Sequence, residues 1–199
     1  MSSSSPELVL ASASPRRRML LAEAGVRFTV LPADIDETAR AGEHPRELVL
    51  RLAREKAQAV AAKLGPTPRR LVLGSDTIVV IGEDVLGKPR DPEHAVELLG
   101  RILGRTHTVF TGVALVDTAD ATARSACVAS DVVMRAASET EVRAYVAGGE
   151  PLDKAGAYAL QGEGRKFVTR VIGSETCVIG LPMDETLALL REAGFAVRA

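Results

Sequence analysis

The sequence predicts an α/β fold in which helices cover a mixed β-sheet. Segments with strand patterns alternate with segments of helical spacing along most of the 199 residues, as in proteins built from β-α-β units. Hairpins interrupt this order. The Val- and Ile-rich run 71–81 meets a turn at 82–84 and returns as 85–86, which predicts an antiparallel pair. The sheet is therefore expected to be mixed and not regularly parallel.

The predicted helices share start and stop signals. Ser14 before Pro15 predicts a helix start, because Ser accepts a hydrogen bond at the N-cap and Pro suits the first helical position. Glycine after a helical segment predicts its end. On these signals helices are predicted at 15–25, 45–64, 91–103, 138–148 and 181–194.

The predicted strands are apolar or β-branched runs between turn residues. Gly112 lies inside one of them and predicts a close approach of another backbone segment. Residues 150–164 show neither period, so they form either a surface connection or a binding loop. Strands are predicted at 8–11, 26–31, 71–81, 85–86, 106–116, 126–134, 167–172 and 176–179, the last two joined by a turn at 173–174.

Composition indicates an ordinary globular protein. With 46% hydrophobic and 26% charged residues, one domain is expected at 7–199, after a disordered polar tail at 1–6. The net charge of -1 gives no basic field for nucleic acid or a membrane. No apolar stretch spans a bilayer and no signal peptide is evident, so a cytoplasmic location is expected. Cys127 and Cys177 are expected to be free, mostly buried thiols.

Asp76 is the first candidate site residue, because it lies in the apolar run 71–81. A buried carboxylate is costly unless it is paired, hydrogen-bonded or bound to a metal. Lys88, after the returning strand, brings a cation that could lie at the same edge. Two interpretations stay open: the start of a site for a metal and a phosphate ester, or a carboxylate satisfied by backbone N–H groups at a strand bend.

Basic residues indicate where an anion could bind. Arg16, Arg17 and Arg18 occupy the first turn of a predicted helix, where positive charge opposes the helix dipole. An anion at the helix start would compensate, and free N–H groups there favour one over an exposed basic turn. Lys56 falls on the apolar stripe of the helix 45–64, and it either extends its ammonium to the surface or points into a site. Surface extension is the commoner case.

Other common site patterns are missing. The sequence has no GxxxxGK[ST] loop and no GxGxxG after the first strand. The histidines show no metal-ligand spacing, and His94 and His107 are expected to be exposed. Ser14 is better explained as a helix cap than as a nucleophile.

Taken together, the motifs resemble the Maf family, the septum-formation-inhibitor-like nucleotide pyrophosphatases. The resemblance covers nearly the whole chain after the serine tail, and so many motifs in one order make a chance match very improbable. For the fold it implies an elongated mixed sheet flanked by helices, with two lobes around a central cleft. The motifs are ASASPRRRMLL at 11–21, AREKA at 53–57, GSDTIV at 74–79, GKPRD at 87–91, TGVAL at 111–115, EPLDKAGAYALQGEG at 150–164 and VIGLP at 178–182.

Within this resemblance, Arg16, Thr77 and Gln161 match the branch that hydrolyses dTTP and UTP to the monophosphate and pyrophosphate. The branch acting on 7-methyl-GTP carries Tyr at the position of Arg16 and differs at the other two. Gln161 offers an amide donor and acceptor suited to a pyrimidine edge, and Thr77 offers a small hydroxyl. Ala13, where relatives often have Gly or Asn, is a small departure.

The resemblance and the chemistry together assign roles to the candidate residues. Release of pyrophosphate needs charge neutralisation and an activated water, which a divalent cation such as Mg²⁺, Mn²⁺ or Co²⁺ supplies. Asp76 is expected to be catalytic, as a general base or as a metal ligand that holds the water, and Glu37 at the end of the acidic loop 34–37 is expected to be the second ligand. The expected substrate-binding residues are Ser14, Arg16, Arg17, Lys56, Thr77, Lys88 and Gln161.

Two alternatives remain at this point: a 7-methyl-GTP pyrophosphatase, which Arg16 disfavours, and a non-catalytic nucleotide-binding regulator of septum formation, as the family's name suggests. The substrate could also include modified pyrimidine nucleotides. The family further suggests a homodimer.

Overall fold

The computed structural model describes residues 6–197. Positions 1–5 of the expected polar tail and the last two residues of the expected domain lie outside that range. The chain divides into two compact units. The first holds the residues up to 76, 111–128 and those from 180 on, and the second holds 77–110 and 129–179. A cleft between two lobes stays a prediction.

The strands of the described residues form a seven-stranded sheet in the order β2-β1-β3-β5-β6-β7, with β4 paired to β3. Strand β1 pairs in parallel with β2 and β3, whereas β4 and β7 pair antiparallel with β3 and β6. The predicted mixed sheet flanked by helices is therefore confirmed. The strands are β1 (Glu7–Leu10), β2 (Thr29–Val30), β3 (Arg70–Ile81), β4 (Asp84–Leu86), β5 (Thr106–Asp117), β6 (Ala123–Met134) and β7 (Val168–Ile172).

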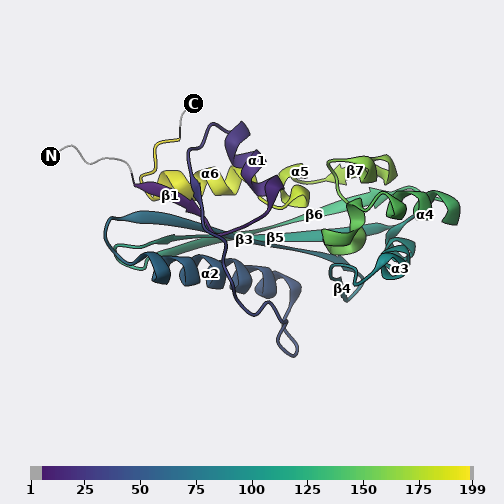
Figure 1. Ribbon diagram of the computed structural model, residues 1–199, viewed down its shortest axis with the longest axis horizontal. Helices are drawn as coiled ribbons and strands as arrows, with labels where there is room; N and C mark the ends of the chain where they lie inside the picture. Colours follow the sequence, from purple (N-terminus) through teal and green to yellow (C-terminus); the bar gives the residue numbers. More distant parts are fainter. Residues whose placement is uncertain (1–5, 198–199) are drawn as a thin grey trace. The chain divides into compact units, whose positions relative to one another are not determined.

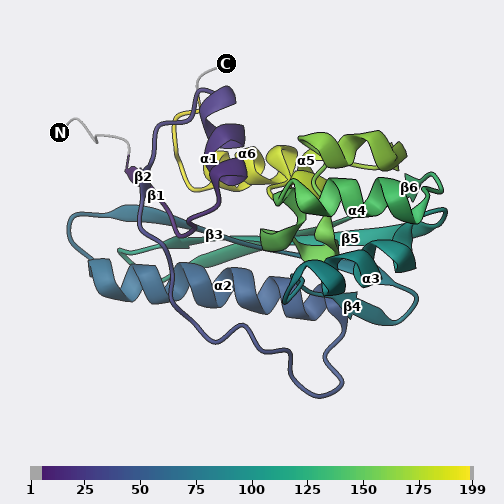
Figure 2. The same ribbon diagram turned by 45° about the vertical axis from the view of Figure 1, so that its right-hand side comes forward.

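Helices flank the strands. In the first unit, α2 lies along one face of the strands, and α1 and α6 lie on the opposite face (Figures 1 and 2). Nowhere in 6–197 is a helix both long and apolar enough to cross a membrane. The helices are α1 (Pro15–Glu23), α2 (Pro45–Leu64), α3 (Pro92–Ile102), α4 (Glu139–Ala147), α5 (Glu175–Ile179) and α6 (Met183–Glu192), with 3₁₀ segments at Glu150–Asp153, Ala155–Ala157 and Glu163–Phe167.

Two glycines allow α2 to lie unusually close to the sheet. A Cβ added at Gly74 on β3 would lie 2.2 Å from the carbonyl oxygen of Ala53, and one at Gly112 on β5 would lie 2.3 Å from that of Val49. Neither position could hold a side chain without moving the helix. This confirms the close approach predicted at Gly112 and adds a second one at Gly74, two residues before Asp76.

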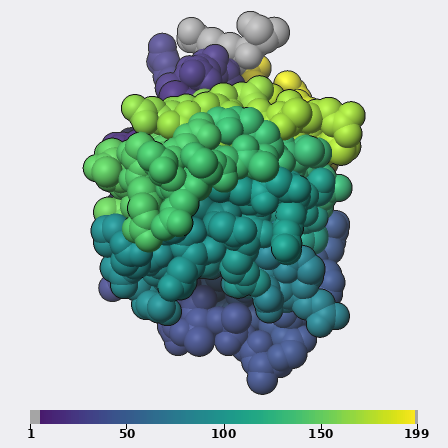
Figure 3. All heavy atoms as spheres, turned by 90° about the vertical axis from the view of Figure 1, so that its right-hand side faces the viewer, coloured from purple at the N-terminus to yellow at the C-terminus, as the bar shows by residue number. Residues whose placement is uncertain are grey.

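The second unit has its own apolar core. Tyr145 of α4 and Phe167 are fully buried and meet edge to face, with ring centroids 5.2 Å apart. Helices α3 and α4 pack against each other, and Figure 3 shows them side by side on the surface, in teal and green. This packing buries the apolar face of α3, including Leu98 and Leu99.

Two predicted elements differ from the structure. The segment predicted as a strand at 176–179 is the helix α5. Ser174 caps this helix, because its hydroxyl accepts a hydrogen bond from the N–H of Cys177 at 3.2 Å, and Glu175 places negative charge in the first turn. A strand predicted at 26–31 is reduced to Thr29–Val30. In both segments the β-branched residues suggested a strand. Capping makes the first one a helix, and pairing with β1 limits the second to two residues.

His107 was expected to be exposed, and this expectation is wrong. The side chain is only 2% exposed on β5, and its Nε2 lies 2.8 Å from the hydroxyl of Tyr158. Among the described residues, its Nδ1 has no hydrogen-bond partner. Burial lowers the pKa of His107 to about 4, against a smaller upward effect of Asp131.

This burial predicts a loss of stability in acid. Because the unfolded chain binds a proton at His107 near pH 6.5 and the folded protein only near pH 4, the contribution is complete above pH 6.5 and disappears as the pH falls toward 4. The loss should be about 3 kcal/mol of unfolding free energy. Urea unfolding of the wild type and of His107→Gln at pH 7 and pH 4.5 measures it. A variant with the same pH dependence as the wild type would contradict this account.

Candidate active site

Three predicted site residues of the first unit meet in one cluster. Asp76 is 6% exposed and lies on the same face of β3 as Gly74, toward α2. Lys56 of α2 is 8% exposed, and its ammonium nitrogen lies 2.7 Å from Oδ1 of Asp76. The same nitrogen lies 3.0 Å from Oε2 of Glu37. Lys56 therefore points inward to two carboxylates and does not extend to the surface.

The two carboxylates differ in their access to solvent. The side chain of Asp76 is 9% exposed and that of Glu37 is 57% exposed, because Glu37 belongs to the irregular segment that precedes α2. A buried acid beside a half-exposed one, both against the same cation, leaves one side of the cluster open to a ligand. The buried carboxylate of Asp76 is thus compensated by an ion pair with Lys56.

This donor set fits a divalent cation. Asp76 and Glu37 supply oxygen ligands, which Mg²⁺ prefers, and both lie within hydrogen-bond reach of one positively charged atom. No group of three or more His, Cys, Asp or Glu side chains suited to a metal occurs in 6–197. Two carboxylates suffice where substrate phosphates and water complete the coordination, as is usual for Mg²⁺.

Arg17 is held in place beside this cluster. Its Nε donates to the carbonyl oxygen of Gly180 at 2.8 Å, and its Nη1 donates to the hydroxyl of Ser12 at 3.1 Å. Ser75, next to Asp76, donates to the same carbonyl of Gly180 at 3.0 Å. Burial lowers the pKa of Arg17, and the negative charge of Asp76 partly offsets that effect. One backbone carbonyl thus ties the guanidinium to the strand that carries the catalytic candidate.

The start of α1 has the predicted geometry. Ser14 is the N-cap, and its hydroxyl accepts a hydrogen bond from the N–H of Arg17 at 3.5 Å. Arg16 is half-buried and Arg18 is exposed. The positive charge of Arg16 is close enough to lower the pKa of Arg17, after the larger effects of burial and Asp76. No acidic residue occupies this first turn. Its basic side chains therefore meet no carboxylate from their own turn, and the start of the helix favours an anion.

The other three candidates belong to the second unit. Thr77 follows Asp76 on β3 and is half-buried. Lys88 is exposed just after β4, and Gln161 is exposed in the segment 150–164. The carbonyl of Gly87 accepts a hydrogen bond from the N–H of Gly156 at 3.1 Å, so the turn with Lys88 is fastened to the segment with Gln161.

Glu150 organises the segment around Gln161. Its carboxylate accepts hydrogen bonds from the hydroxyl of Tyr145 at 2.8 Å and from the N–H groups of Glu163 and Gly164 at 2.9 and 3.0 Å. Burial, the largest single effect, raises the pKa of Glu150, but the two amides, the hydroxyl of Tyr145 and the charge of Lys154 together lower it below its ordinary value. A Cβ at Gly162, whose φ is +123°, would lie 2.4 Å from this carboxylate. The glycine-rich composition therefore serves a defined loop shape.

Sequence reasoning missed the residues that hold the others in place. Ser12, Ser75 and Gly180 position Arg17, and Glu150 shapes the segment of Gln161. Ser12 and Ser75 lie inside the motifs at 11–21 and 74–79, and both are buried polar residues. The partners of Ser12 are near in sequence, whereas those of Ser75 are 37 and 105 residues away. The signals available were that Ser75 lies next to Asp76 and that Ser12 lies shortly before the basic turn 16–18.

Comparisons with known proteins agree on one family. The family model described as Maf-like protein matches residues 7–193. A dTTP/UTP pyrophosphatase of Myxococcus xanthus (strain DK1622) is 54% identical over 187 residues, which are 94% of this chain and 92% of that protein. A dTTP/UTP pyrophosphatase of Shigella sonnei (strain Ss046) is 48% identical over 184 residues, 92% of this chain and 91% of that protein.

A solved structure described as that of the Staphylococcus aureus Ham1 protein is also similar. Its TM-score is 0.47 at 13% identity, over 94% of this chain and 99% of that chain. A likeness this weak says nothing about activity.

Proposed function

Since this chain belongs to the family of Maf-like proteins, we propose that it is a nucleoside triphosphate pyrophosphatase that converts dTTP and UTP to the monophosphate and pyrophosphate. Relatives at 54% and 48% identity over nearly the full length bear the name dTTP/UTP pyrophosphatase. The observation that carries the proposal is the contact of one lysine, Lys56, with Asp76 and Glu37. A triphosphate needs cations to neutralise its charge and a general base to accept the proton of the attacking water, and this cluster offers a lysine and two carboxylates for these roles.

In the proposed reaction, the oxygen of a water molecule forms a bond to the α-phosphorus. The bond from that phosphorus to the oxygen bridging the α- and β-phosphates breaks, and pyrophosphate leaves. Asp76 accepts the proton that the water loses. A divalent cation held by Asp76 and Glu37 would neutralise phosphate charge and lower the pKa of a bound water when present. Lys56 keeps both carboxylates together and offers a positive charge to the phosphates.

Arg16 and Arg17 are proposed to bind the phosphates at the start of α1, with Ser14 and the N-terminal N–H groups of that helix as neutral donors. A contact between a charged donor and a phosphate oxygen contributes about 1.5–3 kcal/mol. The Gly180 and Ser12 hydrogen bonds restrict the guanidinium of Arg17 before the substrate arrives, which lowers the entropic cost of binding. Lys88 is proposed as a further phosphate ligand.

A panel assay tests the proposed function. Pyrophosphate release is measured with dTTP, UTP, dCTP, GTP and 7-methyl-GTP in the presence of Mg²⁺, Mn²⁺ or Co²⁺. Release from dTTP and UTP above all others supports the proposal. Preference for 7-methyl-GTP would assign the chain to the other branch, and nucleotide binding without release would indicate a non-catalytic regulator.

Gln161 is proposed to read the pyrimidine edge together with Thr77. Replacing Gln161 by Glu removes the amide donor and adds a negative charge, so the preference for dTTP over other triphosphates should fall by about tenfold or more, and turnover should change less. Ratios of kcat/KM across the panel measure this. Glu163→Gln, two residues away and exposed, is the control, and an unchanged substrate profile for Gln161→Glu would count against the role.

A further inference from the structure

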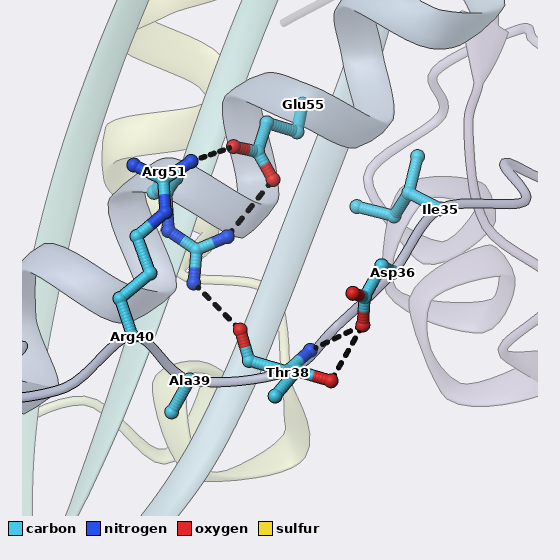
Figure 4. A pocket seen from close by; sticks show the side chains of 7 residues that line it. All are labelled: Ile35, Asp36, Thr38, Ala39, Arg40, Arg51 and Glu55. Atoms are coloured by element: carbon cyan, nitrogen blue, oxygen red, sulfur yellow. Dashed lines mark hydrogen bonds and ion pairs between the residues drawn. The ribbon is translucent and has the colours of Figure 1, made fainter.

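The segment between β2 and α2 carries Glu37 but has no regular secondary structure of its own from 31 to 44. Residues of this segment between 35 and 40 line a surface pocket of about 450 Å³ together with Arg51 and Glu55 of α2. Figure 4 shows that Arg40 and Arg51 project into this pocket and meet Glu55 of α2. An irregular segment of this length needs specific contacts to keep one conformation.

Arg51 supplies those contacts. Its Nε and Nη2 donate to the two carboxylate oxygens of Glu43 at 2.6 and 2.7 Å. Nη2 also donates to the carbonyl oxygen of Thr38 at 3.1 Å, and Nη1 donates to Glu55 at 3.0 Å. One guanidinium of α2 therefore holds both ends of the segment 38–43. Thr38 is the residue that follows Glu37.

Burial makes this an unusually firm contact. The side chains of Arg51 and Glu43 are 14% and 9% exposed, so solvent screens their attraction less than at an open surface. The paired donors of a guanidinium fit a carboxylate in two parallel hydrogen bonds. The hydrogen bond from Arg51 lowers the pKa of Glu43 to about 2, so this carboxylate keeps its charge at neutral pH.

The pocket itself is not a second anion site. Both arginines that line it are already bound to carboxylates, Arg51 to Glu43 and Glu55 and Arg40 to Glu55. The contacts instead run from α2 to the backbone beside Glu37. Lys56, which contacts Glu37, follows Glu55 on the same helix.

We propose that Arg51 is a positioning residue for Glu37. By fastening the carbonyl of Thr38 and the carboxylate of Glu43 to α2, it keeps the Glu37 carboxylate at Lys56 and beside Asp76. The role of Glu37 in metal and substrate binding rests on the proposed function. The attachment of its segment by Arg51 does not rest on that function. Different experimental results would refute the proposed function and the positioning role of Arg51.

The variant Arg51→Gln removes the positive charge of the guanidinium and its paired N–H donors. The concentration of Mn²⁺ for half-maximal binding, measured by titration with electron paramagnetic resonance, is expected to rise by about 10- to 100-fold, as for other residues that orient a metal ligand. The Mn²⁺ concentration for half-maximal binding to Arg51→Lys should lie between those of the wild type and Arg51→Gln. Lysine keeps the positive charge, but one ammonium cannot hold Glu43, Glu55 and Thr38 together. The matched control is Arg54→Gln on the same helix, whose exposed guanidinium donates to the hydroxyl of Ser125 at 2.7 and 3.0 Å.

A double-mutant cycle separates positioning from a merely structural role. If Arg51 acts through Glu37, Arg51→Gln should lower kcat/KM for dTTP when it is the only substitution. It should lower kcat/KM little further in a protein that already carries Glu37→Gln. Effects that multiply, or an Arg51→Gln variant that binds Mn²⁺ like Arg54→Gln, would overturn the proposal. If Arg51→Gln does not fold, as thermal denaturation would show, Glu43→Gln takes its place in the cycle.

The Mn²⁺ titration and the activity assay report on different proposals. A wild type that binds Mn²⁺ but releases no pyrophosphate would refute the proposed function and leave the titration as the test of Arg51. If the wild type hydrolyses dTTP but the effects of Arg51→Gln and Glu37→Gln on kcat/KM simply multiply, only the role of Arg51 is refuted.

Discussion

Replacing Asp76 by Asn is expected to lower the hydrolysis of dTTP and UTP by about two orders of magnitude or more. The substitution keeps the shape of the side chain but removes the negative charge that we propose accepts a proton from water. Lys56 keeps its second carboxylate partner, Glu37, so no buried cation is left unpaired. The fold should therefore survive, and the loss should appear in kcat. Single-turnover and steady-state pyrophosphate release measure it.

Asp120→Asn is the matched control for this experiment. Asp120 is exposed in the turn after β5, where its carboxylate accepts a hydrogen bond from the N–H of Thr122 at 2.8 Å, and Asn can replace that contact. Its activity should equal that of the wild type. Full activity in a correctly folded Asp76→Asn protein would move the catalytic role to another residue.

Gly74→Ala is expected to destabilise the protein by about 3 kcal/mol or more. The added Cβ would lie 2.2 Å from the carbonyl oxygen of Ala53 and 2.9 Å from the backbone nitrogen of Ala57, both on α2. Neither is the flexible end of a side chain, so the helix itself must move. Because these two residues lie on either side of Lys56 along α2, the same movement should lengthen its contact with Asp76. Activity should therefore fall as well as stability.

Urea unfolding and kcat/KM for dTTP measure the two effects of this substitution. Gly100→Ala on α3 is the control, because a Cβ there has nothing within 4 Å beyond its chain neighbours and the backbone of its own helix. It should raise stability by up to about 1 kcal/mol, since Ala favours a helix over Gly. If Gly74→Ala were as stable as the wild type, the close approach of α2 to β3 would not be as described.

Local signals predicted most of the elements because their causes are local. The helix predicted at 45–64 is α2 with the same bounds, Pro45–Leu64, since Pro at its start and Gly after its end act within one turn. Ser138 likewise caps α4 at the predicted position. The wrong prediction of a strand at 176–179 also comes from a local signal. A short β-branched segment suits a strand or a helix, and here the cap at Ser174 and the charge of Glu175 favour the helix.

The residues of the site were predicted mainly from motifs that resemble a family, and the physical argument supported only some of them. A carboxylate in an apolar run indicated that Asp76 needs a partner, but nothing in the sequence showed that Lys56, 20 residues away, is that partner. Arg51, Glu43 and Glu150 went unnoticed, because a charged residue in a helix or loop is usually solvated. His107 was misplaced for a similar reason, since a polar residue at a strand start is usually exposed.

By itself, then, the sequence determined the kind and order of most elements, the mixed character of the sheet and the family to which the chain belongs. The tertiary structure alone decided which charges meet. Capping, turn chemistry and hydrophobic periodicity act over a few residues and are written locally in the chain. The pairing of Lys56 with Asp76 and Glu37, and of Arg51 with Glu43, depends on how closely α2 approaches the sheet and the segment before it. That distance is set by packing between residues far apart in sequence, such as Gly112 against Val49.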